Sequence, residues 1–130
     1  IQEAWAEGPE AYLGATVAGF PNLFLMLGPN TGLGHSSMVF MAEAQTRYIT
    51  AAMRLLERTG ARHIEVRPGV QQRYNDAVQQ RLSTAVWAKG GCQSWYVDPD
   101  GKNRTLWPGY TFAYWWRTRR LDPADYSLSD

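Results

Sequence analysis

The stretch of residues 20–38 constrains the fold more than any other part of this sequence, because it joins an apolar run, a glycine-rich turn and the start of a helix. Residues 20–27 are almost all apolar after Asn22. A short apolar run between turn signals predicts a strand that is buried on both faces. Residues 28–34 contain three glycines and a proline, which predict a turn. We therefore expect a strand, a turn and a helix in succession.

The glycine-rich turn is a candidate ligand edge. Glycines between a strand end and a helix start let backbone amides approach a ligand closely, and open α/β sheets bind ligands at strand carboxyl ends. The alternative is that the same pattern is only architecture. Gly28, Gly32 and Gly34 form neither GxGxxG nor the phosphate-loop pattern GxxxxGK[ST], so this is not a first dinucleotide-binding turn.

Length, composition and charge narrow the functional class. The sequence has 130 residues, 45% of them hydrophobic and 19% charged, which is typical of one globular domain or a piece of one. A formal net charge of +1 argues against a dedicated nucleic-acid or membrane-surface binder. The start at Ile1 shows neither an initiator methionine nor a signal peptide, so we interpret the chain as part of a longer one. A single cysteine, Cys92, fits a reducing compartment such as the cytoplasm.

Residues 37–59 are predicted to form a long helix. Apolar side chains recur there at helical spacing, namely Met38, Met41, Ala42, Ile49, Ala52, Met53 and Leu56. Ser36 or Ser37 is the expected N-cap and Gly60 the C-terminal stop. We expect Gln45 near the outer, polar face of this helix.

A short strand and a second helix are predicted next. Residues 62–66 alternate in polarity, which predicts a strand with His63 as an exposed residue. A helix is expected from Pro68 to about residue 88. Its expected apolar stripe consists of Val70, Tyr74, Ala77, Val78, Leu82, Ala85 and Val86. The opposite face is expected to be solvated and carries Gln71, Asp76, Gln79 and Gln80.

The last third of the chain is predicted to contain a β-hairpin and a helix. Residues 94–97 and 103–107 are strand-like and flank the strong turn Asp98-Pro-Asp-Gly101. Residues 110–120 are predicted to be helical, and Asp122 is expected to cap a short helical start at Pro123. The predicted fold class is α+β.

No hydrolytic or metal chemistry is predicted. His35 is next to Ser36 and Ser37, but sequence neighbours rarely form a nucleophile–base pair and GxSxG is absent. One cysteine and two distant histidines do not make a usual zinc site. Residues 117–120, rich in arginine and next to aromatics, are either a phosphate and stacking surface or a solvated basic helix end.

Two motifs resemble a known family. Residues 19–30, GFPNLFLMLGPN, followed by GLGHS at 32–36, resemble the last FAD-domain segment of Baeyer-Villiger and related class B flavin monooxygenases. Residues 91–96, GCQSWY, then Gly101, Asn103, LWPG at 106–109 and RTR at 117–119 resemble their carboxyl-terminal tail. The resemblance is greatest to the 4-hydroxyacetophenone-monooxygenase type and covers nearly the whole chain.

The resemblance implies a fragment of a larger enzyme. Such enzymes use FAD and NADPH to insert one oxygen from O2 into a ketone or onto a heteroatom such as that of a sulfide. Their GxGxxG turns, FxGxxxHxxxWP fingerprint and active-site arginine lie upstream of the matching segment and are absent here. Residues 1–60 would then end an FAD-binding, Rossmann-like α/β domain with a buried strand plus a long helix. Residues 61–130 would add a helix, a β-hairpin and a C-terminal helical tail, and the fragment alone would be inactive.

The resemblance also assigns roles to residues. The flavin edge would be lined by Gly28, Pro29, Asn30, Thr31 and Gly32. The substrate side would be formed by Leu33, Gly34 and His35, with Met38 between flavin and substrate. Trp95 would lie near the NADP ribose. His35 departs from the better-known members, in which a smaller or apolar residue is expected, and a titratable group there would tune the chemistry or contact a polar substrate.

Two other readings of the sequence stay open. A stand-alone interaction module would use the tryptophan-rich tail, with Trp107, Trp115 or Trp116 as the ligand surface. Nucleic-acid binding through residues 117–120 would show a steep salt dependence. The monooxygenase reading instead predicts a small-molecule substrate, the remainder of a parent enzyme as partner, and exposed apolar surfaces that drive self-association.

Overall fold

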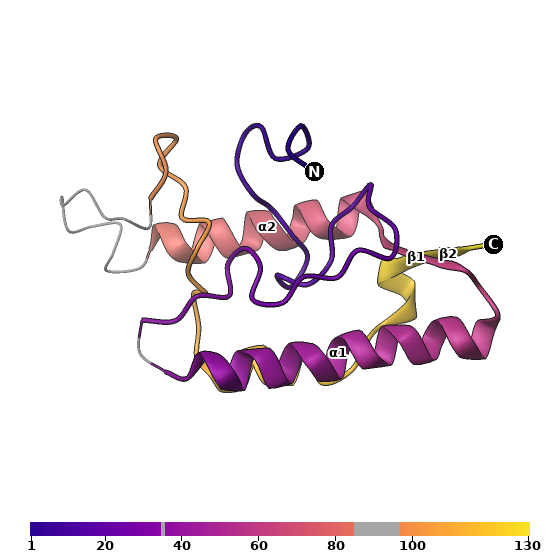
Figure 1. Cartoon of the computed structure of the whole chain (residues 1–130). Coiled ribbons are helices and arrows are strands. Elements are labelled where there is room, and N and C mark those ends of the chain that lie inside the picture. The colour runs from indigo at the N-terminus through magenta and orange to yellow at the C-terminus, as the bar shows by residue number, and fades with distance from the viewer. Residues whose placement is uncertain (35, 85–96) are drawn as a thin grey trace.

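The computed structural model describes residues 1–34, 36–84 and 97–130, which form an α+β fold (Figure 1). Its elements in chain order are α1 (Met38–Thr59), β1 (His63–Val66), α2 (Pro68–Ser83), α4 (Thr111–Thr118), the 3-10 helix η1 (Pro123–Asp125) and β2 (Tyr126–Ser129). Figure 1 shows α1 and α2 as two long helices, with purple loops running between them and the indigo N-terminal end on the other side of α2. Helix α4 packs against α1.

Helix α1 matches the prediction within one residue. Its buried side chains follow the helical period at Met41, Ala44, Gln45, Tyr48, Ala52 and Leu55. Gly60 ends the helix in the left-handed conformation, with φ of 71°, and its amide donates to the Leu56 carbonyl. Gln45 differs from the expectation, because its side chain is fully buried rather than on the outer face.

Strand β1 is confirmed, and its partner is a strand that the sequence reading missed. β1 pairs antiparallel with β2, with Ile64 opposite Leu128 and Val66 opposite Tyr126. Asp122 accepts a hydrogen bond from the Ala124 amide and begins η1, as expected for an N-cap. η1 leads directly into β2, so the chain ends beside the strand that follows α1.

Helix α2 begins at Pro68 as predicted and is described as far as Ser83. Tyr74, Val78 and Leu82 are buried and Val70 is half-buried, which confirms these members of the expected stripe. Ala77 is exposed instead, because it lies off the face that contains these three side chains. The predicted helical residues 85–88 lie outside the described residues.

The predicted strand at residues 20–27 is wrong. Phe24 forms only an isolated bridge with Thr16, and Asn22 and Leu27 have left-handed φ values of 60° and 55° that interrupt an extended chain. Pro21 and Met26 are exposed, so the run is not buried on both faces either. A central strand needs a hydrogen-bonded partner strand on each side. Among the described residues, this segment makes isolated backbone hydrogen bonds and no continuous ladder.

The predicted hairpin is only partly realised. The turn is confirmed, since the Gly101 amide donates to the Asp98 carbonyl at 2.9 Å and Gly101 has φ of 78°. Residues 94–96 of the predicted first strand lie outside the described residues. Within the described part of the chain, only Val97 and Asn103 form a bridge across the turn, and residues 103–107 do not form a continuous strand. Leu106 instead pairs in parallel with Gly32. Helix α4 confirms the helix predicted for residues 110–120.

Aromatic side chains dominate the core that joins these elements. Tyr12 meets Tyr74 edge-on at 5.3 Å between ring centroids, and Trp107 meets Tyr114 in the same way at 5.1 Å. Tyr126 of β2 lies 6.3 Å from Tyr12. These residues come from loops, helices and the last strand, so both halves of the sequence share one core. None of the helices in the described part of the chain is long and apolar enough to cross a membrane.

Candidate cofactor-edge turn

The glycine-rich turn is held by the segment after the Asp98–Gly101 turn. The amide of Asn30 donates to the Arg104 carbonyl at 2.9 Å, and the amide of Gly32 donates to the Thr105 carbonyl at 2.8 Å. The Trp107 amide returns a bond of 2.9 Å to the Gly32 carbonyl. The two motifs on which the family resemblance rests are therefore in direct backbone contact.

The side chains of Asn30 and Thr31 make hydrogen bonds inside the protein. Asn30 is buried, and its amide nitrogen donates to the carbonyls of Asn103 and Leu106 at 2.7 and 3.0 Å. Thr31 is buried too, and its hydroxyl donates to the Gly28 carbonyl at 2.6 Å. With φ of 57°, Asn30 adopts a left-handed conformation that asparagine tolerates better than most residues. Neither side chain therefore presents a free polar group to a ligand.

Gly28 and Gly32 are required by contacts within the protein. A Cβ atom on Gly28 would lie 2.5 Å from the Gly14 carbonyl oxygen, and one on Gly32 would lie 2.8 Å from the Thr105 carbonyl oxygen. Both distances are too short for any side chain. The sequence reading attributed the glycines to ligand approach, whereas the structure gives two of them a packing reason.

Gln45 of α1 fixes the other side of the turn. Its Oε1 accepts from the Leu27 amide at 2.7 Å. Its Nε2 donates to the carbonyls of Leu13 and Gly14, at 3.3 and 3.0 Å. The buried amide therefore connects the helix, the loop at residues 13–14 and the entrance of the turn.

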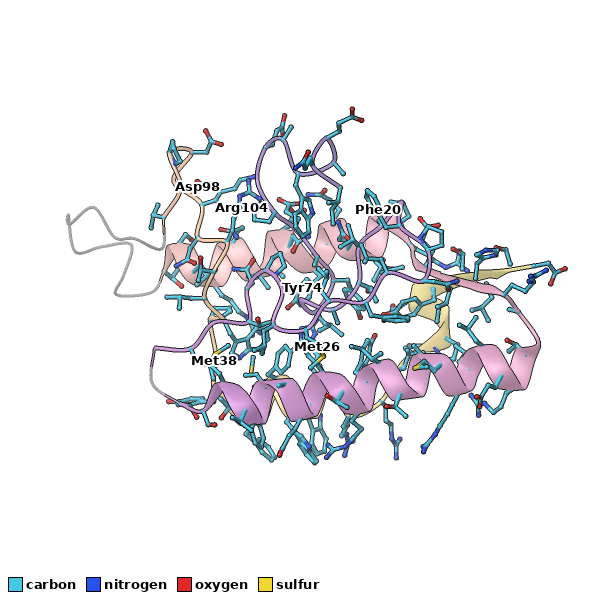
Figure 2. All side chains as sticks on the ribbon, viewed as in Figure 1. Phe20, Met26, Met38, Tyr74, Asp98 and Arg104 are labelled. Atoms are coloured by element: carbon cyan, nitrogen blue, oxygen red, sulfur yellow. The ribbon has the colours of Figure 1, made fainter. Side chains whose placement is uncertain are left out.

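Arg104 anchors the tail segment that pairs with the turn. Its guanidinium bonds the carboxylates of Asp98 at 2.7 Å and Glu10 at 2.9 Å, while the side chain is only 8% exposed. Figure 2 shows Asp98 and Arg104 next to each other above α2. Desolvation raises the pKa of Asp98, but hydrogen bonds from Arg104 and nearby amides outweigh it and lower the pKa overall.

Asn103 is the second anchor of the tail segment. Its backbone amide and carbonyl bond the side-chain amide of Gln79 at 3.2 and 2.8 Å. Its own side-chain oxygen accepts from the amides of Thr105 and Leu106. Gln79 therefore makes contacts inside the protein and does not lie on a solvated face. It fixes the backbone of Asn103, whose carbonyl also accepts from the Asn30 side chain.

The outer rim of the turn is apolar. Met26 and Leu27 are 50% and 40% exposed, and Gly34 is exposed as well. Leu33 and Met38 are half-buried, and Figure 2 shows Met38 at the start of α1. Pro29 is half-buried behind this rim. His35 and Trp95, which the sequence reading assigned to the substrate side and to NADP, lie outside the described residues.

Tyrosine hydroxyls form a second polar group inside the core. Tyr12 donates to the Asp125 carboxylate at 2.6 Å, and the hydroxyls of Tyr48 and Tyr126 are 2.8 Å apart. Tyr114 donates to the Leu13 carbonyl at 2.6 Å. Burial is the main cause that raises the pKa of all four hydroxyls above the usual tyrosine range. They are structural donors that stay protonated at neutral pH.

Three aromatic rings of α4 lie together, with centroids 5.5 to 6.4 Å apart, and we call Phe112, Trp115 and Trp116 the α4 aromatic face. Tyr110, Phe112 and Trp116 are 81%, 64% and 54% exposed. The Arg119 guanidinium lies 3.4 Å from the centroid of the Trp116 ring. Trp107, in contrast, is buried and donates to the Tyr110 carbonyl, so it is not a ligand surface. Among the described residues, no group of three or more potential metal ligands comes together.

Sequence reasoning missed the side chains that hold the turn. Gln45, Gln79 and Arg104 were not candidates, because isolated polar residues normally indicate solvated positions. One signal was available for Gln45: it falls between Met41 and Tyr48 on the apolar stripe of α1. A polar residue on such a stripe indicates a buried group with fixed hydrogen-bond partners.

Comparisons with known proteins agree with this architecture. No family model matches the sequence. A Baeyer-Villiger monooxygenase of Pseudomonas aeruginosa is 50% identical over 130 residues, which cover 99% of this chain and 25% of that protein. A steroid monooxygenase bound to NADP and the monooxygenase OTEMO complexed with FAD and NADP superpose with TM-scores of 0.85 and 0.84, at 23% and 22% identity. Each match covers 99% of this chain, and 25% and 24% of those chains. The chain thus spans about a quarter of the length of these relatives.

Proposed function

Because this chain is homologous over nearly its whole length to one quarter of a Baeyer-Villiger monooxygenase, we propose that it forms part of an FAD- and NADPH-dependent monooxygenase. The enzyme would insert one oxygen atom of O2 into a ketone or transfer it to a heteroatom such as a sulfide sulfur. The observation that carries the proposal is the 50% identity along the entire segment, including both motifs around the turn. A single cysteine is in keeping with an enzyme of the cytoplasm.

Within that enzyme, residues 28–32 would lie along the edge of the flavin ring. Bound FAD, reduced by NADPH, would supply the oxygen-activating chemistry. The residues fit a flat and mostly apolar ring edge, because Met26 and Leu27 expose apolar side chains beside a turn whose backbone is fixed from two sides. The task of this chain's residues is to bind and orient the ring and to exclude water there. Leu33, Gly34, His35 and Met38 would face the substrate side, and Trp95 the NADP ribose.

A chimera tests this proposal directly. The Pseudomonas aeruginosa relative would be expressed with this chain in place of its matching quarter, and the unmodified relative would be the control. We expect the purified chimera to show the visible absorption of bound FAD and to oxidise NADPH faster when a ketone is added. A folded chimera without bound FAD would contradict the proposal. The 130-residue chain alone is expected to be colourless and inactive.

The α4 aromatic face supports a related proposal about partners. Large aromatic side chains at this exposure are costly in water, and we propose that the remainder of the parent enzyme covers them. The same face would drive self-association of the isolated chain. Light scattering of the chain should therefore show oligomers that Trp116→Ser with Phe112→Ser reduces to monomers. A wild-type chain that is monomeric at high concentration would favour a stand-alone interaction module instead.

A further inference from the structure

Two leucines next to the turn have a backbone conformation that leucine avoids. Leu13 and Leu27 both have φ of 55°, in the left-handed region. For a residue with a Cβ atom this conformation costs about 1–2 kcal/mol. Such strain persists only where surrounding contacts fix the backbone, and it gathers at functional sites. The contacts that fix these two leucines therefore indicate what shapes the turn.

Both strained leucines bond to the same side chain. Gln45 accepts from the Leu27 amide and donates to the Leu13 carbonyl. It also donates to the carbonyl of Gly14, which is left-handed too, with φ of 62°. The Gln45 side chain is fully buried and uses its oxygen and its amino group. Its amide can therefore take only one orientation in this site.

The contact with Gln45 reaches the glycine that begins the turn. The Gly28 amide donates to the Gly14 carbonyl at 3.2 Å, the same oxygen that accepts from Gln45. The close approach of Gly28 to this carbonyl leaves no room for a side chain. Gln45 lies on the 22-residue helix α1, so its hydrogen bonds fix the position of the turn relative to a rigid element.

We infer that Gln45 is a positioning residue, which holds residues 27 and 28 in the strained shape that receives the flavin edge. The inference rests on the proposed function and adds a residue that does not itself touch the cofactor. Preorganised backbone needs no rearrangement when a ligand binds. Removal of the Gln45 amide would let Leu27 leave the left-handed region, and FAD would then bind to a turn that first has to be ordered.

Hydrogen exchange in the 130-residue chain tests the structural half of the inference. Gln45→Met keeps the volume but removes all three bonds, and the Leu27 amide should then exchange about five- to tenfold faster. Gln71→Met is the matched control, because among the described residues the Gln71 side chain accepts one hydrogen bond, from the Ala18 amide at 2.8 Å. It should accelerate exchange at Ala18 and leave Leu27 unchanged. Equal exchange of Leu27 in wild type and Gln45→Met would overturn the inference.

The variant Gln45→Glu tests the functional half in the FAD-loaded chimera. When protonated, the new carboxyl group can accept from the Leu27 amide and donate to the Gly14 carbonyl, as Gln45 does. Burial raises its pKa, and after ionisation it repels the two carbonyl oxygens that it faces. The dissociation constant of FAD should therefore rise about tenfold or more between pH 6 and 9 in this variant, relative to the unmodified chimera. This pH-dependent rescue does not follow from a loss of stability alone.

The outcomes separate the two proposals. If the unmodified chimera lacks FAD, the proposed function fails. If it binds FAD and both Gln45 variants bind FAD as tightly as it does at every pH, the inference fails and the proposed function stands. If Gln45→Met does not fold, Gln45→Glu at low pH supplies the folded comparison, and a flat pH dependence of its FAD affinity would overturn the inference.

Discussion

Two regions of this molecule are held together by different physical means. We call residues 13–32 and 103–107 the amide-held loops, because side-chain amides of Gln45, Asn30 and Gln79 fix their backbones. The tyrosine core, in contrast, is made by aromatic side chains: Tyr12, Tyr48, Tyr74, Tyr114 and Tyr126. Stability in the core is spread over many apolar contacts, whereas the shape of the loops depends on a few directional bonds. The candidate site lies in the loops, where the side-chain amides of Gln45 and Asn30 fix the backbone.

The largest effect is expected in the tyrosine core. Tyr48 is 1% exposed, and Tyr48→Ala should lower the free energy of unfolding by about 3–5 kcal/mol, because it leaves a cavity and removes one of the two hydroxyl partners of Tyr126, leaving only Thr16. Tyr48→Phe should cost about 1–2 kcal/mol, since it removes only the hydroxyl bond. Urea unfolding measures both values. A loss below about 1 kcal/mol for Tyr48→Ala would break the contrast between the two regions.

A smaller change in the free energy of unfolding is expected in the amide-held loops, and it should depend on which residue replaces Asn30. Asn30→Gly keeps the left-handed conformation and removes the two side-chain bonds, for an expected cost of about 1–3 kcal/mol. Asn30→Leu removes the same bonds and adds the left-handed penalty, which raises the cost by about 1–2 kcal/mol. Thermal or urea unfolding of the pair measures the difference. Identical stabilities of the two variants would show that the backbone at residue 30 is not fixed as described.

The smallest effect concerns the ion pair that anchors the tail segment. The pKa of Asp98 is lowered in the folded chain, so the carboxylate adds stability above its unfolded pKa near 4, and this stability is lost as pH falls through the folded pKa. Arg104→Met removes the partner, and the variant should lose less stability than wild type between pH 5 and 2. Urea midpoints across this range give the two slopes. Parallel slopes would mean that Arg104 does not stabilise the charged form of Asp98.

The helices were predicted well because apolar residues recur along them at the helical spacing. The apolar spacing from Met38 to Leu56 and the stop at Gly60 predicted α1 almost to the residue. Strand β2 was missed although Tyr126 and Leu128 alternate with serines, because four residues are too short a pattern to distinguish from a turn.

The amide-held loops could not be predicted in the same way. Apolar content suggested a buried strand at residues 20–27, but a strand forms only where partners complete its ladder. The bonds that replace the ladder join Gln45 to Leu27 and Asn30 to Asn103, pairs far apart in sequence and without a periodic signal. The family resemblance predicts a cofactor site at the turn, but it did not indicate that Gln45, Gln79 and Arg104 hold the turn in place.

We propose that residues 28–32 lie along the flavin edge, and a crystal structure of the FAD-loaded chimera would test this claim. We predict backbone atoms of these residues within about 4 Å of the flavin ring, with Leu27 still left-handed and bonded to Gln45. A flavin ring that contacts other parts of the protein and leaves residues 28–32 facing solvent would contradict the claim.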